Sequence, residues 1–339
     1  MIEATGEPGD LRGVVAIGAS AGGVEALSRL AAGLSADVPY AYLITLHIPA
    51  GAPSVLARIL DRSGPLPAVA ARDGAPLEPG QIYVSVPDRH LLVADHRVVL
   101  SQGPTENGHR PAINALFRSV ALVFGSRAIG VLLSGVLDDG VLGLAAIRLR
   151  GGTTIGQAPD DALFPDMPNN AIEAGVVDRQ AAAADIGAVI KELSHREMED
   201  PVTEPDSAME LENRIAMMSR FATGFDTQKL GPPSGYTCPD CNGSLVAVSE
   251  GNFRCQVGHA WTTEALFAAR DTEVEGALWI ALRSMQEKAR MARNLAERAG
   301  PGLVAQRYTS IAEETEGALA VLSDRLPTAS SIAGGDFDE

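Results

Sequence analysis

The segment Val14–Leu27, VVAIGASAGGVEAL, constrains this chain more than any other stretch. An apolar run ends in a glycine cluster that contains Ser20, and a helical pattern of apolar residues follows the cluster. A short buried strand, a glycine turn and a helix form the repeating unit of folds with a parallel sheet. The turn is therefore either a loop that cradles phosphate or a turn that presents Ser20 as a nucleophile.

The alternation of strands and helices continues along the chain. The pattern predicts strands at 13–18, 40–46, 128–134, 153–156 and 176–177, and helices at 24–33, 54–60, 113–124, 142–150 and 182–193. "QIYVSV" and "HLLVADHRVVL" indicate further strands around a turn. Such alternation predicts an α/β domain over 11–196, with a doubly wound, mainly parallel sheet covered on both faces.

A phosphate-binding loop fits the glycine cluster poorly. Gly18 and Gly23 match the outer glycines of a dinucleotide fingerprint, but Ser20 stands where the middle glycine would approach the pyrophosphate. The second strand ends in His47, where the fingerprint requires a carboxylate for the ribose. The Gly-Lys-Ser/Thr ending of a P-loop is also missing. A nucleotide-binding module is therefore kept only as a weaker alternative.

The nucleophile interpretation gains from the same positions. Ser20 follows the first strand, His47 the second, and Asp138 and Asp139 follow the strand AIGVLLSG. The carboxyl ends of parallel strands line one crevice, so a hydroxyl, an imidazole and a carboxylate are expected together. These are the parts of an activated serine. Taken singly, Ser20 could cap a helix, His47 could bind backbone, and the aspartates could form a turn.

Five motifs resemble those of the CheB-type chemotaxis protein-glutamate methylesterases. They are IGASAGGVEAL, LHIPAG, HRPAINALFRSVA, VLLSGVLDDGVLGLAAI and DMPNNAIEAGVVD, in this order over about 13–193. The resemblance implies a doubly wound α/β catalytic domain that hydrolyses glutamate γ-methyl esters on methyl-accepting chemotaxis receptors. It also implies frequent deamidation of receptor glutamines, and no cofactor for catalysis.

The resemblance assigns roles to the strand-end residues. It implies Ser20 as the nucleophile, His47 as the general base and Asp139 as the acid, because Asp139 directly precedes the glycine of SGVLDDG. Asp138 is then a variable neighbour. Chain order is Ser, His, Asp, unlike the Ser, Asp, His order of α/β-hydrolases.

The resemblance also implies a loop that binds the oxyanion and the substrate. Its members here are Ala21, Gly22, Val136 and Met167, and the helix near Gly22 offers N–H groups to an oxyanion. Ala21 stands where the family commonly has threonine, and only its backbone N–H is expected to matter. Leu137 stands where the family has glycine, so a different loop backbone and a narrower cleft are expected.

All three cysteines lie in YTCPDCNGSLVAVSEGNFRCQVGHAW. Cys238-x2-Cys241, thirteen residues and then Cys255-x3-His259 predict a closed, structural Zn²⁺ site with those four ligands. The residues between them predict a hairpin, and Tyr236, Phe253 and Trp261 are expected to supply a small apolar core.

The remaining segments predict a second part of the chain. Residues 197–234 indicate an acidic linker with a short helix at 211–222, and 235–261 indicate a zinc-ribbon-like module. Residues 262–326 predict a helical hairpin, and 327–339 a disordered tail. Family members usually carry an N-terminal phosphoreceiver domain that blocks the cleft, and no such domain is expected here. The appended module is expected to take its place as a docking or regulatory element for a partner.

The balance of charge excludes some partners. A formal net charge of −16 argues against binding nucleic acid or an anionic membrane surface. No apolar stretch long enough for a membrane span and no secretory start are visible, so a cytoplasmic protein without membrane insertion is expected. The alternative to an enzyme is a signalling scaffold with minor catalysis.

Four other histidines and one arginine have roles that the sequence leaves open. His90, His96, His109 and His195 are expected at the surface or in loops, with attention to His109 because HRP lies in a family motif. Arg110 is expected either to line the cleft and steer an acidic receptor or to be a solvated loop cation.

Overall fold

The computed structural model describes residues 11–195, 206–218 and 231–324. The chain forms two compact units, 1–265 and 266–339. Most of the acidic segment and the predicted tail at 327–339 lie outside the described residues.

The first unit is built on a seven-stranded sheet in which all neighbouring strands are parallel. Its order is β3 (Ala68–Ala70), β4 (Ile82–Val84), β2 (Tyr40–Leu46), β1 (Gly13–Ala19), β7 (Ala128–Leu132), β8 (Thr153–Gln157) and β9 (Arg179–Ala181). Every residue of β1 and β2 is buried. Both faces of these strands are covered, which is why their sequences are continuously apolar.

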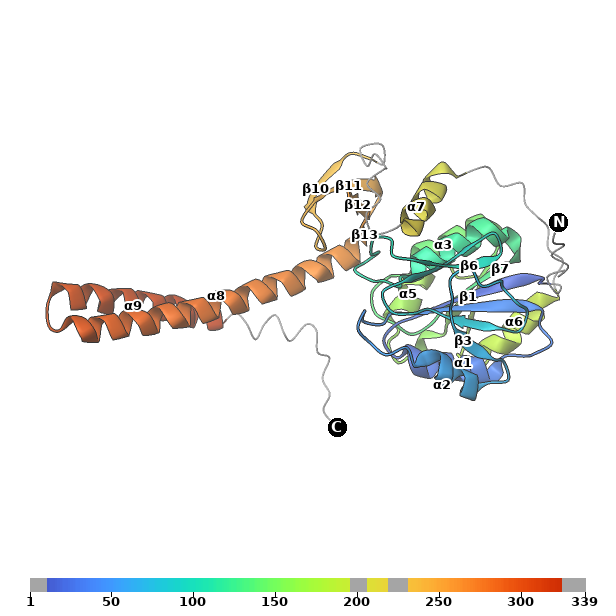
Figure 1. Ribbon diagram of the computed structural model, residues 1–339, viewed down its shortest axis with the longest axis horizontal. Helices are drawn as coiled ribbons and strands as arrows, with labels where there is room; N and C mark the ends of the chain where they lie inside the picture. The colour runs from blue at the N-terminus through green and yellow to red at the C-terminus, as the bar shows by residue number, and fades with distance from the viewer. Residues whose placement is uncertain (1–10, 196–205, 219–230, 325–339) are drawn as a thin grey trace, which may run out of the picture. The chain divides into compact units, whose positions relative to one another are not determined.

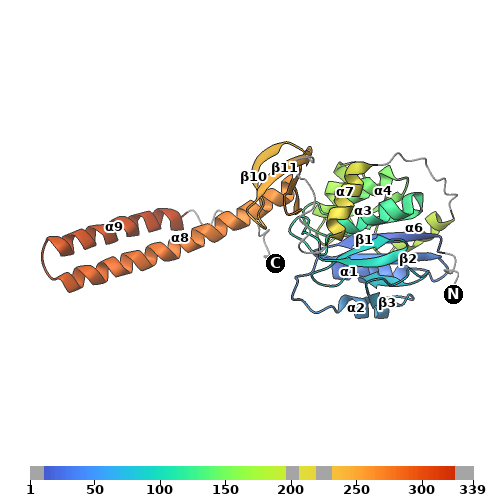
Figure 2. The same ribbon diagram turned by 45° about the horizontal axis from the view of Figure 1, so that its top comes forward.

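Helices cover the two faces of the sheet (Figure 1). One face carries α1 (Gly23–Gly33), α2 (Leu56–Ser63) and α6 (Ile186–Ser194). The other carries α3 (Ile113–Phe124), α4 (Val141–Leu149), α5 (Asp166–Glu173) and α7 (Ser207–Met217), of which α3 and α7 lie side by side in both views (Figure 2). A separate hairpin joins β5 (His90–Ala94) and β6 (Arg97–Ser101), and two 3-10 turns span Gly125–Arg127 and Pro159–Asp161. The doubly wound α/β fold is confirmed.

Several element boundaries differ from the prediction. Strand β3 was not expected, the last strand lies at 179–181 instead of 176–177, and α5 is a helix where none was expected. Helix α7 starts at Ser207, four residues before the predicted helix, because the Asp206 carboxylate accepts from the N–H groups of Ala208 and Met209 at 3.1 and 2.9 Å. The Ser101 hydroxyl donates to the Ala216 carbonyl at 2.5 Å, so α7 packs on the end of β6.

The cysteine-rich module forms an antiparallel sheet of β10 (Pro233–Thr237), β11 (Ser244–Ser249), β12 (Asn252–Cys255) and β13 (Ala260–Thr262). The predicted hairpin is β11–β12. Tyr236 and Phe253 meet edge to face with ring centroids 5.4 Å apart. Trp261 is the cross-strand partner of Phe253; it is 5 % exposed and also lies against Gly108, which precedes α3 in the chain.

The second unit is the predicted helical hairpin, built from α8 (Thr263–Ala299), whose first residues belong to the first unit, and α9 (Leu303–Ser323). Small residues are buried along it, namely Ala289, Ala292 and Ala312. Arg293 donates to both carboxylate oxygens of Glu316, at 3.1 and 2.7 Å. Among the described helices, none has the length and apolar character needed to cross a membrane.

Candidate active site

Ser20, His47 and Asp139 meet where the strand order reverses. Strand β1 lies between β2 and β7, with Ala19 paired to Leu46 and Gly18 paired to Leu132. Ser20 and His47 directly follow β1 and β2, and Asp139 lies in the loop after β7. In an open parallel sheet this switch point is the usual ligand crevice.

The three side chains form one hydrogen-bonded series. His47 Nδ1 lies 3.1 Å from Ser20 Oγ, and His47 Nε2 lies 2.7 Å from Asp139 Oδ2. A neutral imidazole with its proton on Nε2 donates to the carboxylate and accepts from the hydroxyl through Nδ1. The side chains of His47 and Asp139 are 7 % and 3 % exposed. The arrangement is that of a serine activated by a base that a carboxylate orients.

The first turn of α3 holds the Asp139 carboxylate. The Ile113 N–H donates to Oδ2 at 2.7 Å and the Asn114 N–H to Oδ1 at 3.2 Å. The helix can approach because position 18 is glycine, where a Cβ would stand 2.3 Å from Ile113 Cγ2. Burial alone would raise the pKa of Asp139, but the hydrogen bond and charge of His47 outweigh burial and keep that pKa below its usual value.

The neighbouring Asp138 has a different environment. Its Oδ1 accepts from the Thr262 hydroxyl at 2.9 Å. Burial raises the pKa of Asp138 to about 6, against the lowering effect of that hydrogen bond. Leu137, just before it, has a φ of 62°, the left-handed region that glycine adopts without steric cost. The leucine therefore holds the glycine-like conformation under strain.

Ala21 and Gly22 lie between the nucleophile and α1. Gly22 has a φ of 70° and is the N-cap of that helix. Among the described residues, no acceptor is found for the backbone N–H of Ala21 or Gly22, whereas the Ser20 N–H donates to the Ser134 carbonyl at 2.9 Å. Two N–H groups at a helix N-terminus beside the serine can receive an oxyanion.

Met167 and Val136, the other two residues predicted to bind the oxyanion or substrate, differ in burial. Met167 is fully buried against Gly135, where a Cβ would stand 2.5 Å from Met167 Sδ and 2.9 Å from Ser20 Cβ. Gly135 therefore lies between the Met167 side chain and Ser20. Val136 is 40 % exposed on the same loop.

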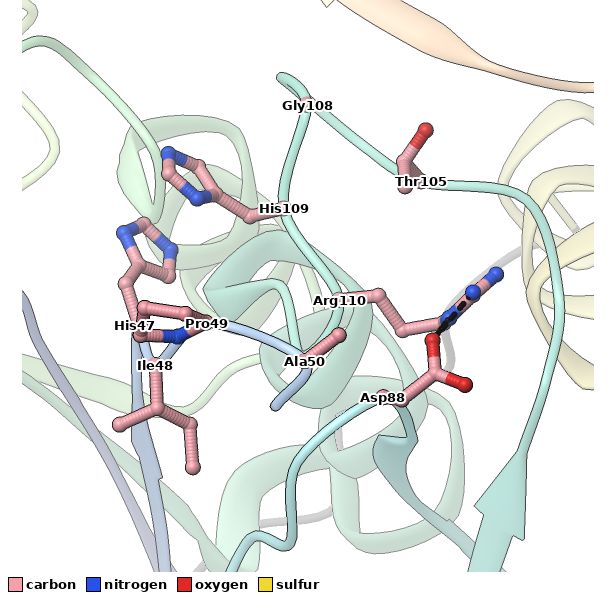
Figure 3. Close-up of a pocket in the computed structure, with 9 residues that line it drawn as sticks. All are labelled: His47, Ile48, Pro49, Ala50, Asp88, Thr105, Gly108, His109 and Arg110. Carbon is pink, nitrogen blue, oxygen red and sulfur yellow. Dashed lines mark hydrogen bonds and ion pairs between the residues drawn. The ribbon is translucent and has the colours of Figure 1, made fainter. Parts of the chain in front are cut away.

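A cavity of about 430 Å³ opens beside His47 (Figure 3). The His109 ring stacks on His47 with centroids 3.7 Å apart and planes 11° apart. Burial and the charge of His47 lower the pKa of His109 to about 4, so His109 is neutral at pH 7. A neutral ring there does not oppose positive charge on His47.

Arg110 also lines this cavity, as one of the two expectations had it. Its Nε donates to Asp88 Oδ1 at 3.0 Å and its Nη1 to the Gly103 carbonyl at 2.9 Å, so the guanidinium is paired rather than solvated. His96 and His195 are exposed, as expected, but the expectation for His90 was wrong. His90 is fully buried, with Nε2 2.8 Å from the Pro104 carbonyl and Nδ1 accepting from the Ala112 N–H.

The predicted metal ligands lie together in the module. One donor atom from each of Cys238, Cys241, Cys255 and His259 lies within 4.8 Å of all the others. His259 Nδ1 is 3.6 Å from Cys238 Sγ and 3.4 Å from Cys255 Sγ, and the sulfurs of Cys241 and Cys255 are 3.6 Å apart. A tetrahedral ion with bonds of about 2.0–2.3 Å separates its ligands by roughly 3.5–3.8 Å. The four residues therefore fit Zn²⁺.

Comparisons with known proteins agree with this fold. The family described as CheB methylesterase matches residues 15–190, just over half of the chain. Protein-glutamate methylesterase/protein-glutamine glutaminase 3 of Anaeromyxobacter dehalogenans (strain 2CP-C) is 44 % identical over 167 residues, which cover 49 % of this chain and 49 % of the relative. Protein-glutamate methylesterase/protein-glutamine glutaminase 1 of Caulobacter vibrioides is 40 % identical over 185 residues, covering 53 % and 54 %.

A solved structure is similar as well. The Thermotoga maritima CheB methylesterase catalytic domain has a TM-score of 0.51 and 30 % identity, over 53 % of this chain and 98 % of that one. The chain spans about half the length of the curated relatives it matches. Since the family match covers all three strand ends at the crevice and the fold agrees, this chain belongs to the CheB methylesterase family.

Proposed function

We propose that the chain is a serine carboxylesterase that hydrolyses glutamate γ-methyl esters on methyl-accepting chemotaxis receptors. The observation that carries the proposal is the series Ser20 Oγ, His47 Nδ1 (3.1 Å), His47 Nε2 and Asp139 Oδ2 (2.7 Å). The names of the relatives, which include both methylesterase and glutaminase, support this substrate class.

Acylation of the enzyme comes first. His47 Nδ1 takes the Ser20 proton while Ser20 Oγ attacks the γ-carbonyl carbon of the methyl ester. The N–H groups of Ala21 and Gly22, at the N-terminus of α1, stabilise the oxyanion. His47 then gives its proton to the departing methoxide, so methanol leaves and a glutamyl–serine ester remains. Asp139 stays ionised and stabilises the imidazolium.

Water completes the cycle by the same route. His47 takes a proton from water, hydroxide adds to the acyl carbon, and collapse returns the proton to Ser20 and frees the glutamate. A receptor glutamine follows the same path, with ammonia leaving instead of methanol. We propose this deamidation as a second activity of the site, since it needs no group beyond those of the esterase.

The cysteine-rich module has the ligands for a structural metal ion. We propose that Cys238, Cys241, Cys255 and His259 hold Zn²⁺, because the donor atoms already have the spacing of a tetrahedral ion. Four protein ligands leave no open position, so this metal supplies no catalysis. Three free thiols in one cluster suit a reducing compartment, and we place the protein in the cytoplasm.

Methanol release from methylated receptor fragments tests the esterase. The wild type should release methanol, and Ser20→Ala should lower kcat by on the order of 10³-fold or more, because the nucleophile is lost. Ser28→Ala is the matched control: among the described residues, that hydroxyl bonds only to the Val24 carbonyl within α1, and its loss should leave kcat unchanged. No methanol from the wild type, or equal release by Ser20→Ala, would contradict the proposal and favour a scaffold.

A further inference from the structure

The metal module adds its last strand to the loop that carries His109. The Asn107 N–H donates to the Ala260 carbonyl at 2.8 Å, and the Ala260 N–H donates to the Thr105 carbonyl at 3.1 Å. The Thr262 N–H donates to Asn107 Oδ1 at 2.9 Å. Glu106 and Ala260 thus form an isolated parallel β-bridge between the loop and β13, and the bond from Thr262 to Asn107 joins positions 155 residues apart.

A buried ionic cluster fixes the same loop from the other side. Glu106 is 3 % exposed and pairs with Arg118 of α3. Arg254 of β12 is 2 % exposed, with Nη2 3.8 Å from Glu106 and 3.5 Å from Glu212 of α7. A buried pair is costly to break, because removing one partner leaves a desolvated charge. The cluster therefore locks β12, the loop, α3 and α7 into one arrangement.

The residues that contact the loop are adjacent to the proposed metal ligands. Arg254 Nη1 donates to the Gly258 carbonyl at 2.6 Å, in the turn between Cys255 and His259. The Cys255 N–H donates to the His259 carbonyl at 3.0 Å, and β13 starts at the next residue. A four-stranded sheet this small has little apolar core, so the proposed metal would hold this turn in place.

The loop and the turn that the module contacts also carry neighbours of His47 and Asp139. His109, two residues after Asn107, stacks on His47. The Thr262 hydroxyl bonds to Asp138, next to the Asp139 carboxylate that holds His47. The Trp261 ring lies 3.3 Å from the place a Cβ would occupy at Gly108. Module residues thus contact both the loop that carries His109 and the turn that carries Asp139.

We propose that the Cys3His module is a positioning element of the esterase, and that its metal sets the geometry of the His109 loop and the Asp138–Asp139 turn. Thr262 and Arg254 are the positioning residues that transmit this effect. The proposal rests on the proposed esterase activity. It gives the module a task inside the chain, beside the docking or regulatory role expected from sequence.

Metal removal from the full chain is the first test. The protein is compared as loaded with Zn²⁺, after chelation, and after Zn²⁺ is restored. Chelation should lower kcat on methylated receptor fragments by on the order of 10-fold or more, because a displacement of about 1 Å is costly in a catalytic site. Restored Zn²⁺ should recover kcat. The rate at which a fluorophosphonate labels Ser20 should fall and recover in parallel.

The second test changes one hydroxyl. Thr262→Val keeps the β-branched shape but removes the donor to Asp138, and kcat should fall severalfold with KM unchanged, because Thr262 lies outside the lining of the cavity. Thr262→Ser restores the hydroxyl and should restore kcat. Thr272→Val is the matched control: within the described part of the chain, its hydroxyl bonds only to the Ala268 carbonyl of α8, and kcat should be unchanged.

The outcomes separate the two proposals. Chelated protein that has lost its metal yet keeps full kcat and labelling rate would overturn the positioning role and leave the esterase intact. A loaded wild type without methanol release would overturn the esterase, while the labelling rates still decide the positioning role. A fall in thermal stability with unchanged kcat at 20 °C would show a merely structural module.

Discussion

At the scale of single residues, two adjacent carboxylates are distinguished by what surrounds them. The Asp139 carboxylate accepts hydrogen bonds from His47 Nε2 and from two N–H groups of α3, whereas the Asp138 carboxylate accepts one from the Thr262 hydroxyl. Asp139→Asn should lower kcat by on the order of 10⁴-fold, because an amide cannot hold the imidazole in the right tautomer or stabilise its charged form.

The same substitution at the preceding residue, Asp138, is the matched control for Asp139→Asn. Asp138→Asn keeps an oxygen that accepts from Thr262, and kcat should stay within about threefold. Methanol release by the two variants measures the contrast. Equal losses would contradict the assignment of Asp139 as the partner of His47.

The raised pKa of Asp138 gives a separate prediction for stability. Its folded pKa of about 6 exceeds the ordinary 3.8, so the folded state holds the proton more tightly. The free energy of unfolding therefore falls as pH rises from about 4 to 6, and the full cost remains at pH 7. Asp138→Asn should raise the free energy of unfolding by about 3 kcal/mol at pH 7 and by little at pH 4. Urea unfolding at both pH values measures this difference, and an equal gain at the two values would contradict it.

At the scale of elements, α3 anchors the loop that bears Asp139. Asn114 Oδ1 accepts from the N–H groups of Gly140 and Gly143 at 3.0 and 2.8 Å, inside the buried junction of α3 and α4. Asn114→Ala leaves both groups without this acceptor and should cost about 2–4 kcal/mol of unfolding free energy. Asn169→Ala, at a half-buried position of α5, is the control. It should change the free energy of unfolding by less than about 0.5 kcal/mol. Urea unfolding measures both variants. Equally small changes for Asn114→Ala and Asn169→Ala would show that the bonds to Asn114 do not stabilise the fold.

Elements with strong local signals were predicted well from sequence. Strand 40–46 and helix 113–124 have the predicted bounds, because apolar runs and apolar periodicity report burial directly. Strand β3 has three residues and α5 contains Pro168, so neither has a periodic signal long enough to recognise. The crevice residues could be predicted because topology alone brings strand ends to one edge. His90 was misplaced because its burial depends on Pro104 and Ala112 packing around it.

At the scale of the whole molecule, sequence order hides which segments work together. The Cys3His module belongs to the same compact unit as the catalytic domain, although the acidic segment separates them in the chain. No local pattern marks Arg254, Trp261 or Thr262 as partners of the loop at 105–109, because those contacts depend on how two distant segments pack. The metal spacing could be predicted, whereas its connection to the active site could not.

The division into two units predicts the result of truncation. Ending the chain after Arg270 removes most of the helical hairpin but keeps β13 and its contacts with Asn107 and Asp138. This shortened chain should retain kcat within about twofold. Ending the chain after Met218 removes the module as well and should lower kcat by on the order of 10-fold, because the His109 loop loses β13 and Arg254. Methanol release, together with the thermal midpoint of each chain, checks the contrast. Equal activity of the two truncations would show that the catalytic domain positions its own loop, and a loss in the longer one would assign a catalytic task to the hairpin.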